Sequence, residues 1–100
     1  MAADVVDLGA LAGRLPRAWQ SLLLGRVGPA RLKLVRMDQA PYAEEAHADA
    51  EALLVLDGEL RLRVAGEARI VRAGELCLVP PGVAHAVEPG SAGTLLIIDV

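Results

Sequence analysis

The residues of this 100-residue chain that could do chemistry are two histidines and a group of acids. His47 lies among four carboxylates in EEAHADAE, residues 44–51, and His85 follows in PPGVAHAV. A divalent ion such as Fe, Mn, Ni or Zn binds nitrogen and oxygen donors that converge at about 2.0–2.2 Å. The sequence therefore predicts either no metal or one such ion, whose candidate ligands are His47, Glu51, His85, Glu45 and Glu44.

A second interpretation of the same residues needs no metal. The acids would form the solvated rim of a pocket, and His85 would be a partly buried histidine bonded to a neighbour such as Glu51. A regular strand would point His47, Asp49 and Glu51 to one side, whereas a loop before residue 51 would not. Both interpretations stay open, and metal binding should fail in acid because it needs neutral histidine and ionised glutamate.

The charge of the chain argues against some classes of binding partner. A net charge of −3 argues against nucleic acid and anionic membrane surfaces. Residues 14–36 carry six basic residues and no acid, whereas residues 38–59 carry seven acids and no base. Either two neighbouring strands pair by opposite charge, or the acids form a mouth that favours a cation. No basic start or long apolar run of a leader or membrane span is found, so a cytoplasmic location is expected.

The first part of the chain predicts a short helix and a hairpin. Residues 8–15 suit a helical turn, which Pro16 should end. GPA then separates two runs, residues 21–27 and 31–37, and in the second run Leu32, Leu34 and Arg36 alternate with Arg31, Lys33 and Val35. This pattern predicts a β-hairpin.

The rest of the chain predicts short strands at regular spacing. Asp57–Gly58 predicts a type I′ hairpin, and Gly66 and Gly74 mark further turns. In ELRLRV, residues 59–64, the leucines should face one way and the arginines the other. Cys77 lies in an apolar run and is expected to be a small buried residue. Seven or more such strands predict an all-β antiparallel sandwich or barrel.

Two spacings resemble the motifs of the cupin superfamily. The second motif is matched by Gly74, five residues, Pro80, one residue, Gly82, two residues and His85, and the end of the first by Glu51, six residues and Gly58. The resemblance implies a double-stranded β-helix (jelly-roll) cupin barrel of the small single-domain bacterial kind. It implies one domain over residues 1–100, made of an N-terminal segment (1–19), a lead-in hairpin (20–37) and the barrel core (38–100). Gly58, Gly74, Pro80 and Gly82 are structural turn residues under either interpretation of the site.

The resemblance also implies a ligand set of three histidines and one glutamate, with two of the histidines in an H-x-H pair before the glutamate. Glu51 and His85 occupy two of these places. With three residues between the pair and Glu51, the pair falls on Glu45 and His47; with four, it falls on Glu44 and Ala46. An ungapped match from LVRM selects four. The site is therefore predicted to be degenerate.

Three functions are compatible with this sequence. The first is a binding or sensing module for a small ligand. The sequence has no other catalytic constellation, because Ser21 and Ser91 lie far from both histidines in sequence and no phosphate-binding glycine loop occurs. The second is a metal-dependent cupin enzyme, an isomerase, dioxygenase or decarboxylase, and whether the protein is an enzyme stays open. The third is a dimeric structural or interaction scaffold.

The resemblance extends to a subgroup, and the apolar strands predict an assembly. The lead-in LKLVRM looks like the mannose-6-phosphate-isomerase-like cupins, but the acidic motif region argues against a phosphorylated sugar, which needs basic residues at the mouth. ALLVL and LLII are apolar on both faces, and a large exposed apolar patch is rare on a monomer. A homodimer is therefore expected.

Overall fold

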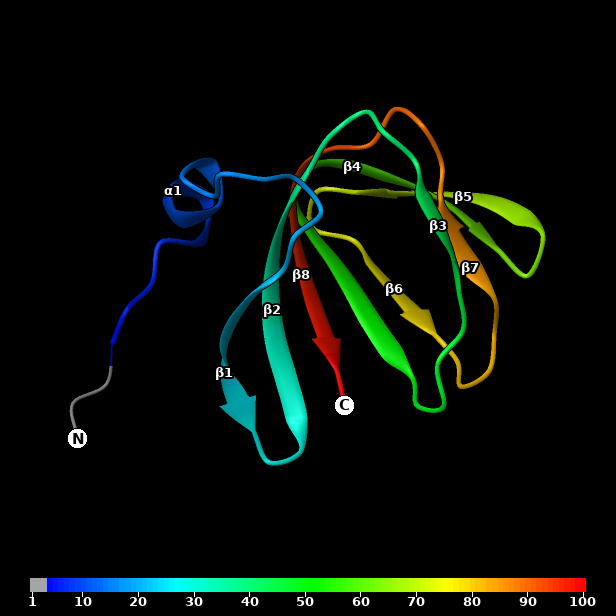
Figure 1. Cartoon of the computed structure of the whole chain (residues 1–100), viewed down its shortest axis with the longest axis horizontal. Coiled ribbons are helices and arrows are strands. Elements are labelled where there is room, and N and C mark those ends of the chain that lie inside the picture. Colours follow the sequence, from blue (N-terminus) through cyan, green and yellow to red (C-terminus); the bar gives the residue numbers. More distant parts are fainter. Residues whose placement is uncertain (1–3) are drawn as a thin grey trace.

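The computed structural model describes residues 4–100, so the first three residues of the predicted N-terminal segment lie outside the described residues (Figure 1). A short helix precedes eight strands, and this helix lies beside the barrel (Figure 1). The elements are α1 (Leu8–Gly13), β1 (Leu22–Val27), β2 (Ala30–Met37), β3 (Tyr42–Glu45), β4 (Glu51–Val64), β5 (Glu67–Arg72), β6 (Leu76–Val79), β7 (His85–Val87) and β8 (Ala92–Asp99).

The long strand β4 organises the barrel because it pairs with four other strands. Its N-terminal half pairs with β6 and β8, and its C-terminal half pairs with β5 and β7. β8 continues the sheet to β2 and β1, and β7 continues it to β3, with every pairing antiparallel. The sheet curls round on itself (Figure 1). The expected jelly-roll barrel with a short N-terminal helix is confirmed.

The helix and the first hairpin form where the sequence predicts them. The side chain of Asp7 accepts a hydrogen bond from the backbone N–H of Ala10, which caps the start of α1. β1 and β2 are joined at Gly28, whose φ of +58° suits a tight turn. At six residues, α1 is far too short to cross a membrane, and no other helix occurs among residues 4–100.

The predicted hairpin at Asp57–Gly58 is wrong. Both residues lie inside β4, opposite Thr94 and Gly93 of β8, next to a bulge that shifts the register. Gly58 and Gly93 have φ of +75° and +106°, and a Cβ on either residue would overlap the backbone of the other strand. Gly58 therefore bends a continuous strand between the two halves of the barrel. A tight turn and such a bend use the same left-handed glycine, so the dipeptide does not distinguish them.

The core lies on the inner face of the barrel. Leu60 and Leu62 are buried at 0% and 1% exposure, whereas the alternating Arg61 and Arg63 are exposed, which confirms the predicted alternation. The core cluster also contains other inward residues, which are Val35, Met37, Leu53, Val55, Val71, Val79 and Leu95. Cys77, expected to be buried, packs against this cluster but is only partly buried.

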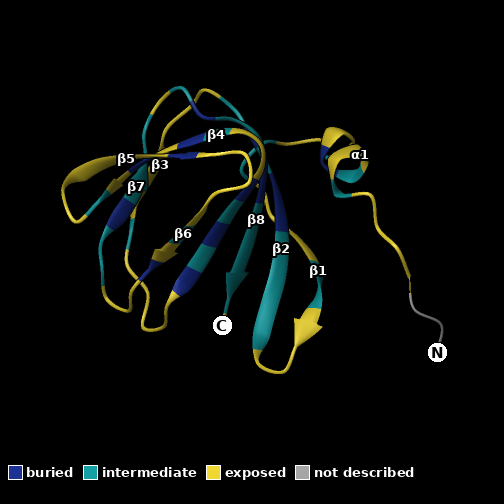
Figure 2. Cartoon of the chain, turned by 180° about the vertical axis from the view of Figure 1, so that it is seen from behind, coloured by how far each residue is buried: buried dark blue, intermediate teal, exposed yellow. Residues whose placement is uncertain are grey.

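The outer face of the sheet is apolar as well. Leu34 is completely buried apart from the main core, on the strand that α1 contacts, and Ala12 of that helix is buried with it. Farther along the same face, Leu76 and Leu78 of β6 are 58% and 63% exposed. β6 is accordingly drawn partly in yellow (Figure 2). The helix thus covers only one end of this face.

Candidate metal centre and ligand pocket

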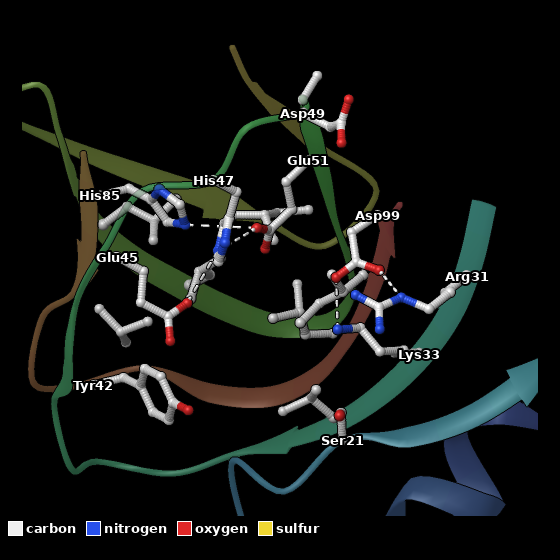
Figure 3. Close-up of a pocket in the computed structure, with 18 of the residues that line it drawn as sticks. Ser21, Arg31, Lys33, Tyr42, Glu45, His47, Asp49, Glu51, His85 and Asp99 are labelled. Carbon is white, nitrogen blue, oxygen red and sulfur yellow. Dashed lines mark hydrogen bonds and ion pairs between the residues drawn. The ribbon is translucent and has the colours of Figure 1, made fainter. Parts of the chain in front are cut away.

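A pocket of about 430 Å³ opens into the barrel interior. Its floor is apolar and includes Leu53, Leu60, Leu62 and Leu95. Its polar residues gather at two places, with Glu45, His47, Glu51 and His85 on one side and Arg31, Lys33 and Asp99 on the other (Figure 3). Strands β2, β3, β4, β7 and β8 all contribute to the walls, so the pocket exists only in the closed barrel.

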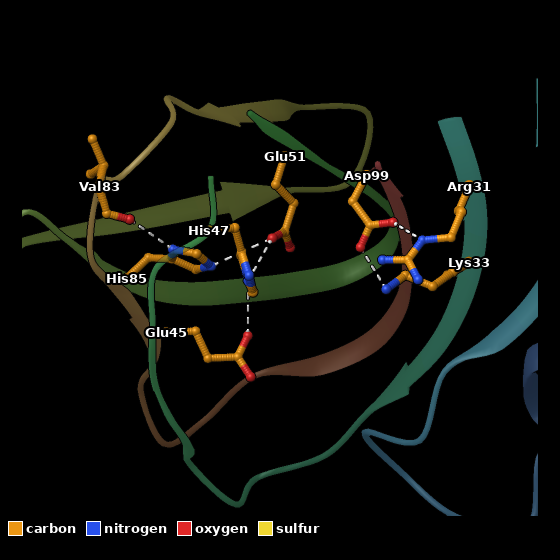
Figure 4. A network of polar contacts seen from close by, with 8 residues as sticks. All are labelled: Arg31, Lys33, Glu45, His47, Glu51, Val83, His85 and Asp99. Atoms are coloured by element: carbon orange, nitrogen blue, oxygen red, sulfur yellow. Dashed lines mark hydrogen bonds and ion pairs between the residues drawn. The ribbon is translucent and has the colours of Figure 1, made fainter. Parts of the chain in front are cut away.

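His85 is the most buried polar side chain of the first group. It begins β7, and its side chain is 8% exposed. Its Nδ1 lies 3.1 Å from the carbonyl oxygen of Val83, which can only accept, so this hydrogen bond requires the proton on Nδ1. The lone pair of neutral His85 is then on Nε2, which faces the carboxylate of Glu51 at 3.7 Å (Figure 4). This is the arrangement of a metal-binding histidine whose other ring nitrogen is fixed by a backbone carbonyl.

His47 joins two carboxylates at the pocket mouth. Its Nε2 lies 3.2 Å from Oε2 of Glu45 and 3.2 Å from Oε2 of Glu51. The His47 and His85 rings are 5.5 Å apart, and ligand atoms of Glu45, His47 and His85 all lie within 4.8 Å of one another. Glu51 is buried at 8% exposure, and its Oε2 faces both imidazoles. The four side chains lie together in one wall of the pocket and are linked through His47 and Glu51 (Figure 4).

The glycine–proline turn of the second motif helps to hold this group together. The backbone N–H of Gly82 donates to the carbonyl oxygen of His47 at 2.7 Å, and the N–H of Val83 donates to that of Pro80 at 3.3 Å. The turn between β6 and β7 therefore fixes the loop that carries His47 and also supplies the carbonyl that orients His85. Gly74, with φ of +84°, lies in the preceding turn between β5 and β6.

The structure places the two candidate positions of the first ligand pair differently. Glu45 and His47 both line the pocket, as the alignment with three intervening residues predicts, whereas Glu44 is exposed and is not among the lining residues. Residues 46–50 form a loop between β3 and β4, so the argument from strand parity does not apply to them. Asp49 in this loop lines the pocket rim but stays exposed.

The second polar group was missed as a site in the sequence. Lys33 and Arg31 of β2 both contact Asp99 of β8, with Nζ at 2.6 Å from Oδ2 and Nε at 2.9 Å from Oδ1 (Figure 4). Burial raises the pKa of Asp99, but the hydrogen bonds and charges of Lys33 and Arg31 outweigh it and hold that pKa below its usual value. The sequence did contain a signal for this group. Arg31, Lys33 and Val35 are two residues apart, so on a strand they share one face, and Val35 is a core residue on that face.

Two expectations about charge are thereby corrected. The basic and acidic segments do not pair as neighbouring strands, because β2 pairs only with β1 and β8. They face each other across the pocket instead (Figure 3). The mouth also has basic residues, Arg31 and Lys33, which the acidic motif region did not suggest.

The first group of residues fits a divalent metal ion. Two imidazole nitrogens and carboxylate oxygens suit Fe(II), Mn(II), Ni(II) or Zn(II). The hydrogen bond to Val83 fixes Nδ1 of the buried His85. Among the residues described, no lysine or arginine lies within 4.0 Å of the carboxylates of Glu45 and Glu51. The geometry can therefore hold one cation at the edge of an open pocket.

The comparisons with known proteins agree with this fold. The sequence matches the family described as a cupin domain over residues 35–100. The chain therefore belongs to the cupin family. No curated protein matches the sequence. The narrower resemblance to the mannose-6-phosphate-isomerase-like subgroup stays an expectation from the sequence.

Solved structures of similar shape include two bacterial proteins and a dioxygenase. A cupin-2 domain containing protein from Shewanella frigidimarina aligns with a TM-score of 0.86 and 22% identity over 95% of this chain and 93% of that one. A protein from Neisseria meningitidis aligns with a TM-score of 0.83 and 22% identity over 97% and 99%. A hydroquinone 1,2-dioxygenase, described in complex with Cd2+ and 4-hydroxybenzonitrile, aligns at 0.78 and 16% identity over 92% and 69%. At these identities the shared property is the fold.

Proposed function

We propose that this protein binds one divalent transition-metal ion through Glu45, His47, Glu51 and His85, and binds a small organic molecule in the pocket beside that ion. The ligand set differs from the three histidines and one glutamate that the cupin resemblance implies, since Glu45 takes the place of one imidazole. A carboxylate is an oxygen donor that each of these ions accepts. The motif thus still supplies four ligands, but a carboxylate replaces one imidazole.

One observation carries this proposal. Nε2 of neutral His85 and Oε2 of Glu51 are both hydrogen-bond acceptors, and they face each other at 3.7 Å with side chains only 8% and 10% exposed. Two weakly exposed acceptors that face each other favour a cation between them. A divalent ion would bind acceptor atoms of His85, Glu51, His47 and Glu45 together. A proton on His85 would bridge only His85 and Glu51.

The residues around the ion have separate tasks. The bound metal would act as a Lewis acid on an oxygen atom of the ligand. The carbonyl of Val83 keeps His85 in one orientation, and the N–H of Gly82 keeps the His47 loop in place. The leucine and valine floor removes water from the ligand. This combination supports recognition of a small molecule.

Binding or sensing is the function that these residues support best. Ser21 is the one serine or threonine that lines the pocket among the described residues. Ser91 is fully buried and accepts a hydrogen bond from the backbone N–H of Arg61, which gives it a structural role. A second candidate is a metal-dependent isomerase, dioxygenase or decarboxylase. Its support is the fold shared with a hydroquinone 1,2-dioxygenase.

Metal content tests the proposal directly. Untagged protein purified without chelators, and then loaded with Fe, Mn, Ni or Zn, should contain about one ion per chain. His85→Ala should lose it. Val83→Ala is the matched control, because it removes a half-buried side chain from the same turn but keeps the carbonyl that orients His85. Wild-type protein without metal after loading would refute the proposal.

We further propose that the chain forms a homodimer through the outer face of its main sheet. Leu78, Ala52, Ile98 and Leu32 form one row across β6, β4, β8 and β2, and Leu76, Leu54, Leu96 and Leu34 form the next. Apart from Leu34, which is already completely buried, these apolar rows across four strands are a surface that a second copy could cover.

A further inference from the structure

We infer that the pocket recognises a small organic acid, whose anionic group binds Lys33 and Arg31 while an oxygen atom at its other end reaches the metal centre. The inference rests on the proposed function, since it places the ligand and the metal in one pocket. It adds the chemical class of the ligand and the residues that select it.

Lys33 and Arg31 have more positive charge and more donors than their partner uses. Both contact the single carboxylate of Asp99, and no second carboxylate lies within 4.0 Å of either cation among residues 4–100. An ammonium group has three N–H donors and a guanidinium group has five, so most of them remain for other acceptors. The Lys33 side chain is only 20% exposed, which makes water a limited substitute. A carboxylate or phosphate oxygen is the natural acceptor here.

The two ends of the pocket are close enough for one small molecule. Ala52 of β4 pairs with Ile98 of β8, so Glu51 and Asp99 start and end neighbouring strands. Arg31 of β2 pairs with Asp99 on its other side. Two strand spacings, about 10 Å, therefore separate the backbones that carry Glu51 and Arg31. Their side chains extend into the space between, so one ring or a short chain is long enough.

The floor between the ends favours an apolar middle part of the ligand. Leu53 and Ile97 form a cross-strand pair between Lys33 and the acids, and Leu60 and Leu62 lie beneath them. Apolar surface buried here contributes to affinity without selecting a charge. The expected ligand is thus a hydroxy- or oxo-acid with a short hydrocarbon segment.

The charges of the lining couple anion binding to the metal. The lining includes two basic residues and four carboxylates, Glu45, Asp49, Glu51 and Asp99. Without a metal the pocket is net negative and repels an anion, and a divalent ion brings the lining close to neutrality. Metal and acid should therefore strengthen each other's binding.

Acid and amide pairs test the inference by calorimetry on the metal-loaded protein. The probes are 4-hydroxybenzoate and unbranched hydroxy acids of two to six carbons, each beside its neutral primary amide, with the matching phosphate monoesters as a third arm. At least one acid or phosphate should bind about tenfold or more tightly than its amide. Whichever anion gains more identifies the anionic group. Metal-free protein should lose this preference.

Lys33→Met isolates the side chain that selects the anion. It leaves Arg31 paired with Asp99 and should remove about tenfold of the affinity for the acid, while the affinity for the amide stays within about twofold. Arg72→Met is the matched control, because it makes the same change in net charge at an exposed residue of β5 that does not line the pocket. Its acid preference should equal that of the wild type.

A second readout uses the fact that Lys33 is the only lysine in the chain. The tightest acid should protect Lys33 from acetylation in metal-loaded protein, measured by peptide mass spectrometry, and its amide should not. Metal-loaded protein that binds acids and amides alike, or an acid preference unchanged in Lys33→Met, would overturn this inference alone. Absence of metal from the wild type would instead overturn the proposed function.

Discussion

Glu45 and Glu44 provide a matched pair for testing the metal centre, because they are the same residue type at neighbouring positions of β3. Glu45→Gln should weaken metal binding strongly, and Glu44→Gln should not. Both substitutions remove one negative charge, but only Glu45 lies in the pocket, with Oε2 at 3.2 Å from Nε2 of His47. The difference between the variants therefore measures direct coordination.

The two expected effects can be estimated separately. Removing an outer partner of a metal ligand typically costs about 10–100-fold in affinity, so loss of a ligand itself should cost at least that, or more than about 1.4 kcal/mol. Glu44 acts only through its charge. A unit charge about 10 Å from a divalent ion in water contributes about 0.8 kcal/mol, and a Debye length of about 8 Å reduces this to about 0.2 kcal/mol. Glu44→Gln should therefore change the affinity by less than about twofold.

Competition with a chelating dye, with Zn(II) and Co(II) in separate titrations, measures both affinities at pH 7. Thermal unfolding of the metal-free variants checks that each one still folds. Equal losses in the two variants would mean that Glu45 acts through general electrostatics, and an unchanged affinity in Glu45→Gln would exclude it as a ligand. Either result would refute the assignment of this carboxylate to the metal centre.

Three further predictions concern the frame of the site. Gly93→Ala should lower the free energy of unfolding in urea by more than about 2 kcal/mol, because its Cβ would overlap β4. Gly66 also has a positive φ but lies in open space, so Gly66→Ala should lower it by about 1 kcal/mol. Equal losses in the two variants would contradict this explanation. The lowered pKa of Asp99 means that its ion pairs stabilise the fold above pH about 4 and are lost as the pH falls further. Asp99→Asn should therefore flatten the acid limb of stability against pH, and an unaltered limb would be evidence against this. Light scattering should find a dimer that Leu78→Glu dissociates, whereas a monomeric wild type would exclude the dimer.

Much of the fold follows from local patterns in the sequence. The alternation of leucine and arginine in residues 59–64 fixed which face of β4 is buried, and the glycines and prolines placed most of the turns. The Asp57–Gly58 dipeptide was the exception. The dipeptide indicates a glycine in the left-handed region, which suits both a chain reversal and a bend in a continuous strand. Only the pairing of Gly58 with Gly93 shows that the strand continues.

The site divides in the same way. The sequence by itself identified His85 and Glu51, because the spacing of the cupin motifs ties both to strand positions and a turn. It did not decide between Glu44 and Glu45, since a loop follows β3 and no strand period extends across it. It also did not place Lys33 and Arg31 opposite the acids. That juxtaposition depends on β8 lying between β2 and β4, a contact between segments far apart in the chain, which the closed barrel alone determines.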